Sequence, residues 1–421
     1  MRGATGSVPG RGHTPTGPVG PRFVATYALA YMSVALMLIA PLLVTLALKI
    51  RSIVGAEQAP ESLALVTGVG GLLTVVAAPV FGRLSDRTPS RYGMRRPWMV
   101  GGLTGGVLGI AVVATAPSVV VVLIGWCLAQ VSFNALQAAL VAVLPDQVPV
   151  SQRGTVSGVL GITVPVAAVL GTFLVQLFEG HQPAMFLAPC VIGSCLVLLF
   201  TLHLHDRRLD RATARRWTLR DLGAAFHLDP RRSPDFAWAF VGRFLFICAF
   251  AFLTTYQAYY LIDRVGSAEA EVPAQVFLAT LVQSAVLVVA SLVGGRLSDR
   301  RRRRKVFVAA AALTYGVALF VIAAADSFGG FLVGMAISGL GFGTYMAVDL
   351  ALVADVLPNS ADSARDLGLF NIANALPYAL APAVAPLILA ASGDSYAVLY
   401  AVAGTCALLA AAAVVPIRSV R

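Results

Sequence analysis

One carboxylate lies deep inside an apolar stretch of this sequence. Asp349 precedes Pro358 by nine residues, which places it about 13 Å from the end of a helix that rises 1.5 Å per residue. A charge in such a segment is costly and usually functional, so Asp349 is the candidate for taking up and releasing a proton. The alternative is a structural carboxylate that is paired with an arginine or capped by hydroxyls. Arg243, early in another apolar stretch, is a candidate for gating or ligand binding, unless it only extends toward the interface.

Amide and phenol side chains gather on several apolar stretches. Such groups can hydrogen-bond a polar solute and present aromatic faces to it in a largely preformed cavity. The alternative is a set of interfacial tyrosines and hydrogen bonds between helices, which we expect for Tyr259 and Tyr260. The predicted binding residues are Tyr27, Tyr31, Asn134, Gln137, Tyr256, Gln257, Tyr345, Asn371 and Asn374.

A pentapeptide occurs twice in the chain. Gly82-Arg83-Leu84-Ser85-Asp86 recurs as Gly295-Arg296-Leu297-Ser298-Asp299, 213 residues later, and Val-Leu-Pro at 143–145 recurs at 356–358 with the same offset. Two echoes in one register indicate an internally duplicated membrane protein.

Each copy of the pentapeptide places an acid at the end of an apolar stretch, in a basic loop. Asp86 should face the start of the stretch near residues 366–368, where a helix dipole and free N–H groups favour negative charge, and Asp299 should face the equivalent start near 154–155. Such contacts would hold one side of the protein shut, as a latch that breaks on opening. The alternative is that basic loops only reflect topology. The predicted latch comprises Asp86, Arg87, Arg95, Arg96, Asp299, Arg300, Asp146 and Asp355.

Composition makes the bilayer the solvent for most of the chain. Hydrophobic residues make up 58% of the 421 residues and charged residues 12%, against roughly 25% charged in a soluble domain. Twelve apolar segments are long enough to cross a membrane as helices. The predicted fold is therefore an all-α membrane protein, with twelve transmembrane helices in two pseudo-symmetric six-helix bundles. The predicted spans are 24–48, 62–82, 98–116, 119–144, 155–178, 185–204, 236–262, 273–294, 306–325, 329–356, 367–391 and 395–416.

Lysine and arginine predict the orientation. With the N-terminus inside, cytoplasmic segments carry 27 of the 31 basic residues, so both termini are expected in the cytoplasm of a multi-pass protein of the cell membrane. The predicted organisation is a disordered tail (1–22), a first bundle (23–204), a basic cytoplasmic linker (205–235) and a second bundle (236–421). The linker is either an amphipathic helix on anionic headgroups or a solvated connection.

The same charge bias explains the basic balance of +11 without a nucleic-acid partner. The five cysteines lie in apolar segments with no metal-ligand or disulfide spacing, so no metal and no cofactor are expected. No cluster of catalytic residues suggests an enzyme. The expected partners are a small-molecule solute, protons and the lipid bilayer, and the expected assembly is a monomer.

The loop from Gly82 to Pro97 resembles the signature between the second and third helices of the major facilitator superfamily. Its spacing is similar to that of sucrose–proton and glycoside–cation symporters, and Asn134-Ala135-Leu136-Gln137 weakly resembles their fourth helix. The resemblance implies proton-coupled symport of a sugar or similar small polar solute by alternating access. The alternative is efflux of a drug or secondary metabolite. Drug–proton antiporters of this superfamily often carry an arginine in the fourth span and a Gly-Pro motif in the fifth. Here the fourth span has no arginine and the fifth has only Gly158, Gly161 and an isolated Pro165, so efflux is less favoured. A membrane receptor on the same fold is a further alternative.

Overall fold

The structure, a computed structural model, describes residues 18–204, 206, 234–301, 303–356 and 372–417. Most of the predicted tail and linker therefore lies outside the described residues. The described chain is helical, with no strand in these ranges. The first half contains α1 (Pro21–Ala40), the π-helix η1 (Pro41–Thr45), α2 (Leu46–Asp86), α3 (Arg96–Thr115), α4 (Val119–Gln147), α5 (Val150–Leu177) and α6 (Gln182–His203). The second contains α8 (Pro234–Asp263), α9 (Val272–Arg301), α10 (Arg304–Ala324), α11 (Phe328–Val356), α13 (Pro377–Ser392) and α14 (Tyr396–Ala413).

Eleven helices of the described chain are long and apolar enough to span a membrane. The first of them, Pro21–Asp86, has 66 residues and holds two predicted spans. The chain turns between them at Gly55, whose φ of 76° and ψ of −179° are not helical. Glycine adopts this conformation without the steric cost that a Cβ would add. The eleven helices therefore provide the twelve predicted spans.

Prolines shape several of these helices. Pro41 begins the π-turn η1, in which the N–H of Leu46 donates to the Pro41 carbonyl, and such turns locally widen a helix. Pro165 lies inside α5. Pro377 instead starts α13, where the first helical position needs no backbone N–H.

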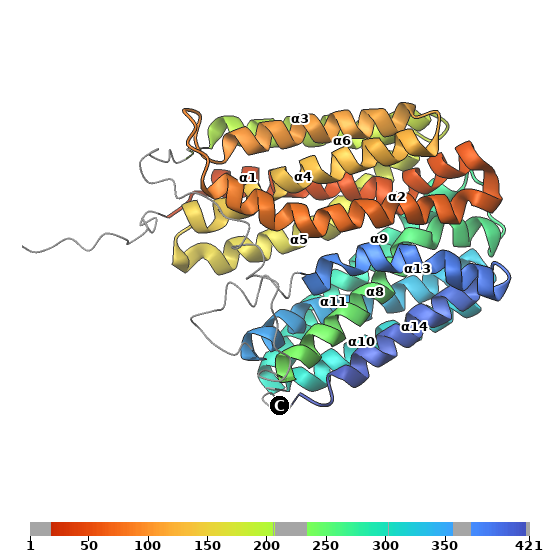
Figure 1. The fold of residues 1–421 in the computed structure, drawn as a ribbon. Coiled ribbons are helices and arrows are strands. Elements are labelled where there is room, and N and C mark those ends of the chain that lie inside the picture. The colour runs from red at the N-terminus through yellow and green to blue at the C-terminus, as the bar shows by residue number, and fades with distance from the viewer. Residues whose placement is uncertain (1–17, 205, 207–233, 302, 357–371, 418–421) are drawn as a thin grey trace, which may run out of the picture.

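The two halves form two bundles with matching packing. Figure 1 shows α1 to α6, red to yellow-green, as one group beside α8 to α14, green to blue. Within the first half, α1 packs on α5 and α6, and α4 packs on α2 and α3. Within the second, α8 packs on α13 and α14, and α11 packs on α9 and α10. These pairs correspond under the repeat, so the packing has the predicted pseudo-symmetry.

The most extensive helix contacts between the halves also correspond under the repeat: α2 with α13, and α9 with α5. We call the end of the bundles that carries residues 82–86 and 295–299 the motif end. The last described residues also lie there, because Lys305 Nζ donates to the Ile417 carbonyl at 2.8 Å. The opposite end, where the chain turns at Gly55, is called the Gly55 end.

Candidate functional site

Asp349 is buried in the second bundle and forms an ion pair with Arg243. The two side chains come from α11 and α8, and the residues are 2% and 8% exposed. Nη1 of Arg243 donates to Oδ2 of Asp349. Nη2 of the same guanidinium lies 3.5 Å from Oδ1 of Asn374, which precedes α13. Three helices of one bundle therefore meet at a single charge pair.

Aromatic rings surround this ion pair. Tyr345 lies one helical turn before Asp349, and its ring stacks on that of Phe246 with centroids 3.6 Å apart and planes 6° apart. The Phe250 and Phe342 rings also stack, at 4.3 Å. Because aromatic surroundings exclude water, charge interactions in this cluster are stronger than at the surface.

The ion pair limits what the Asp349 carboxylate can do. A buried charge that loses its partner is strongly destabilising, so proton uptake at Asp349 requires the guanidinium to move away or to find another acceptor. Asn374 is within reach of the guanidinium. Separation of the pair is therefore a condition for protonation of Asp349.

The first bundle contains a cavity of about 250 Å³ between α1, α4 and α5. Tyr31 lines it, as does Tyr27, whose hydroxyl donates to the Leu140 carbonyl at 2.7 Å. The other lining residues are mostly aliphatic, with a single hydroxyl from Ser157; they are Val141, Leu144, Ser157, Leu160, Gly161 and Val164. The cavity suits a ligand with a large apolar surface and few polar groups.

Asn134, an amide candidate on α4, faces α2. Nδ2 of Asn134 donates to Oγ1 of Thr74 on α2 at 3.1 Å, and the Thr74 hydroxyl lies 3.4 Å from Oε1 of Gln130. Asn134 and the half-buried Gln137 are not among the residues that line the cavity. The structure therefore brings Tyr27 and Tyr31 together, but directs Asn134 to the contact between α2 and α4.

Tyr256 and Gln257 lie between the halves at the Gly55 end. The Tyr256 hydroxyl donates to the carbonyls of Pro382 and Pro60, at 3.1 and 3.4 Å. Nε2 of Gln257 lies 3.5 Å from the Leu43 carbonyl. Both side chains thus tie α8 to backbone carbonyls of the first half.

The neighbouring Tyr259 and Tyr260, which we expect from the sequence to be interfacial, are both fully buried inside the protein. The Tyr259 hydroxyl donates to the Ala47 carbonyl at 3.0 Å, and the Tyr260 hydroxyl to the Ile322 carbonyl at 2.6 Å. Each phenol hydroxyl donates to a backbone carbonyl inside the protein, so burial leaves neither hydroxyl without a hydrogen bond.

Arg51 adds an ion-pair bridge between the halves that the sequence did not reveal. Its guanidinium lies 3.0 Å from an Asp263 carboxylate oxygen and 2.8 Å from one of Glu269. This bridge was hard to predict from the sequence. The three charges stand at the ends of different predicted spans, and 212 or more residues separate Arg51 from either acid.

Arg95 is the centre of the described part of the predicted latch. Its guanidinium lies 2.6 Å from Asp86 and 2.9 Å from Asp146, and it donates to the Ser85 hydroxyl at 2.6 Å. All four residues belong to the first half. Arg95 therefore ties α2 to α4 at the motif end.

The other latch candidates have varied positions. Arg96 donates to the Leu202 carbonyl at 3.2 Å, Arg87 follows α2 as its C-cap, and Arg300 is exposed near the end of α9. The side chains of Asp299 and Asp355, and the whole of Asn371, lie outside the described residues.

Asp206 is a further residue that sequence reasoning missed. Its Oδ2 accepts the backbone N–H groups of Arg95 and Arg96 at 2.7 and 2.8 Å, which caps the start of α3. Gly93 makes room for this carboxylate: its φ is 104°, and a Cβ there would lie 2.2 Å from Asp206. In the sequence, this cap could have been suspected from the single acid that directly follows the sixth apolar stretch.

The described residues contain no group of three or more His, Cys, Asp or Glu side chains that could hold a metal ion. All five cysteines are free.

A family model described as Major Facilitator Superfamily matches residues 23–282 and 272–420. The chain is 28% identical over 225 residues to the class G tetracycline resistance protein of Vibrio anguillarum, covering 48% of this chain and 53% of that one. It is 32% identical over 152 residues to the multidrug resistance protein MdtL of Klebsiella pneumoniae (strain 342), covering 35% and 38%. The matches thus span about half or less of these relatives.

Among solved structures, a crystal structure of a mutant of the nucleoside transporter NupG superimposes with a TM-score of 0.74. The alignment covers 94% of this chain and 99% of that one, at 13% identity. At this identity the likeness shows the fold alone.

Proposed function

The chain belongs to the Major Facilitator Superfamily, and from this premise we propose that it exports an organic compound with a large apolar surface in exchange for protons. It does so by alternating access, as a monomer in the cell membrane. The motif end is the cytoplasmic end, since basic loops favour that side. The chain is a transporter and not an enzyme, like the relatives it matches.

The observation that carries this proposal is the lining of the cavity between α1, α4 and α5. Two phenol rings and several aliphatic side chains face it, with one serine hydroxyl. A sugar needs many hydrogen-bond partners, whereas an aromatic drug-like molecule needs apolar contact and a few polar ones. The relatives named for tetracycline and multidrug resistance support the same class of substrate.

The Arg243–Asp349 pair is the proposed coupling site. When the halves rearrange, the guanidinium can turn toward Asn374, which lies 3.5 Å away, and the freed carboxylate then takes a proton. Closure restores the pair and expels the proton. This scheme ties one proton to each cycle through groups that are already in contact.

The test uses purified protein in proteoliposomes with an imposed pH gradient. We expect gradient-driven accumulation of tetracycline, a marked loss in Tyr31→Ala, and little change in the control Tyr92→Ala, because Tyr92 is an exposed loop residue. Accumulation that ignores the pH gradient would contradict proton coupling. Equal transport by Tyr31→Ala would contradict the cavity as the substrate site.

The second candidate is import of a sugar or similar polar solute with protons. The loop from Gly82 to Pro97 and the amide cluster of Asn134, Thr74 and Gln130 favour it. A labelled disaccharide panel in the same proteoliposomes separates the two candidates, since only one class of compound should accumulate.

A further inference from the structure

One face of α5 forms a wall of the cavity between α1, α4 and α5. Four residues of α5 line that cavity, namely Ser157, Leu160, Gly161 and Val164. Their spacing of three and four residues places them on one side of the helix, with Gly161 in the middle. Because glycine has no side chain, the part of Gly161 that lines the cavity is its backbone.

The Gly161 backbone is also accessible. Gly161 is an exposed residue, and a Cβ added to it would meet no atom of a neighbouring helix within 4 Å. A ligand in the cavity can therefore approach the main chain of α5 at this position, as glycine permits.

The carbonyl of Gly161 lacks the donor that a regular α-helix supplies. In a helix, the N–H of each residue donates to the carbonyl four residues earlier. The residue four positions after Gly161 is Pro165, which lies inside α5 and has no N–H. The Thr163 hydroxyl does not replace that donor, because it donates to the Leu160 carbonyl at 2.6 Å. A carbonyl freed in a membrane-spanning helix needs a donor from elsewhere.

The wall on α4 repeats this arrangement. Val141 lines the cavity, and the residue four positions later is Pro145, inside α4. By contrast, the Tyr27 hydroxyl in the same cavity already donates to the Leu140 carbonyl at 2.7 Å. Main-chain acceptors on two helices therefore favour a ligand that donates hydrogen bonds.

We propose that the Gly161 carbonyl accepts a hydrogen bond from an N–H or O–H group of the transported compound. The cavity then selects aromatic compounds that carry such a donor over those that lack one. Pro165 sets this specificity without touching the ligand, because it keeps a helical N–H away from the carbonyl. The inference rests on the proposed function in taking this cavity as the substrate site.

The test compares 3-methylindole with 1-methylindole, two isomers of which only the first has an N–H. Binding to the purified full chain in detergent is measured by equilibrium dialysis, with protein-free micelles as the blank. We expect 3-methylindole to bind about fivefold more tightly, as one hydrogen bond allows. Pro165→Ala supplies the missing helical N–H, so it should weaken binding of 3-methylindole alone and bring the two affinities together.

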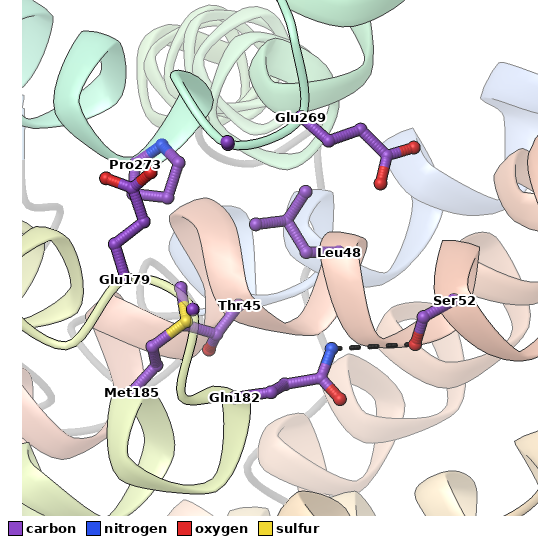
Figure 2. A pocket seen from close by; sticks show the side chains of 10 residues that line it. Thr45, Leu48, Ser52, Glu179, Gln182, Met185, Glu269 and Pro273 are labelled. Carbon is purple, nitrogen blue, oxygen red and sulfur yellow. Dashed lines mark hydrogen bonds between the residues drawn. The ribbon is translucent and has the colours of Figure 1, made fainter.

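Pro189→Ala is the matched control. Pro189 lies inside α6 and removes the helical donor for the Met185 carbonyl in the same way. Met185, however, lines a different cavity, of about 260 Å³, and contributes its side chain there (Figure 2). This variant should keep the preference of the unmodified protein for 3-methylindole.

Equal binding of the two isomers by the unmodified protein, or no binding of either, would overturn the proposal without any variant. A preference that survives in Pro165→Ala would place the acceptor elsewhere, and an equal loss of both isomers would mean that the proline only shapes the cavity. These measurements do not involve transport. A preference for 3-methylindole without pH-driven export of tetracycline would contradict the proposed function alone, whereas export without the preference would contradict this specificity alone.

Discussion

The two halves share a backbone but differ in their charges. In the second half, Arg243 and Asp349 form a buried pair between α8 and α11. The residues 213 positions earlier, Ala30 on α1 and Leu136 on α4, are apolar and fully buried. The first half thus builds the same helix arrangement without any charge at these positions.

The first half instead has an ion-paired cluster at the motif end. Arg95 bridges Asp86 and Asp146 there, and the Asp86 side chain is 56% exposed. Exposed pairs contribute little to stability, whereas a buried pair is costly to break and can be replaced by apolar side chains. Packing therefore does not require the Arg243–Asp349 pair, which supports a functional role for it.

The largest expected effect comes from breaking the buried pair on one side. Arg243→Ala leaves the Asp349 carboxylate buried without its guanidinium, which should lower the free energy of unfolding by about 3–5 kcal/mol. Unfolding of the purified protein in detergent measures this loss. A loss below about 1 kcal/mol would mean that the pair contributes no more than a surface ion pair. The charges of the two halves would then not differ in their effect on stability.

The second prediction makes the second half resemble the first. Arg243→Met with Asp349→Leu removes both charges, and methionine keeps much of the volume of the arginine stem. We expect the free energy of unfolding to return to within about 1–2 kcal/mol of the unmodified protein. Gradient-driven transport should nevertheless be lost, while exchange of substrate across the membrane is retained. Accumulation driven by an imposed pH gradient in this double variant would rule out Asp349 as the coupling site.

The third prediction concerns the motif end of the first half. Gly93→Ala forces a Cβ onto a residue with φ of 104° and into the Asp206 carboxylate, at a cost of about 1–3 kcal/mol. Gly101→Ala is the matched control, because it lies in α3 with no atom near the added Cβ. Alanine there should leave stability equal or slightly higher. Equal unfolding midpoints for the two variants would contradict the role of Asp206 as a cap.

The smallest effect on stability is expected for Asp86→Asn. Asp86 is more than half exposed, and Arg95 keeps Asp146 at 2.9 Å, so the change should be within about 1 kcal/mol. Transport should still become slower, with substrate binding to the purified protein unchanged. Transport at the unmodified rate, at equal amounts of protein in the membrane, would argue that the motif end is only a topological signal.

The sequence predicted the site in parts. It identified Asp349 and Arg243 separately, because each interrupts an apolar stretch, but it did not pair them. It grouped Tyr256 and Gln257 with the binding residues, whereas both bond to backbone carbonyls at the Gly55 end. It did not find Asp206 or Arg51, because their partners lie at least 110 residues away.

The spans, the duplication and the superfamily could be predicted from the sequence alone. Each follows from local properties: about twenty apolar residues cross a bilayer, and a repeated pentapeptide is visible without a structure. Which side chains meet depends on the tertiary structure. Arg243 and Asp349 are 106 residues apart, and their contact depends on how α8, α11 and α13 pack. Helical periodicity sets which residues share a face of one helix, but which faces oppose each other is set by the shapes of all the helices together.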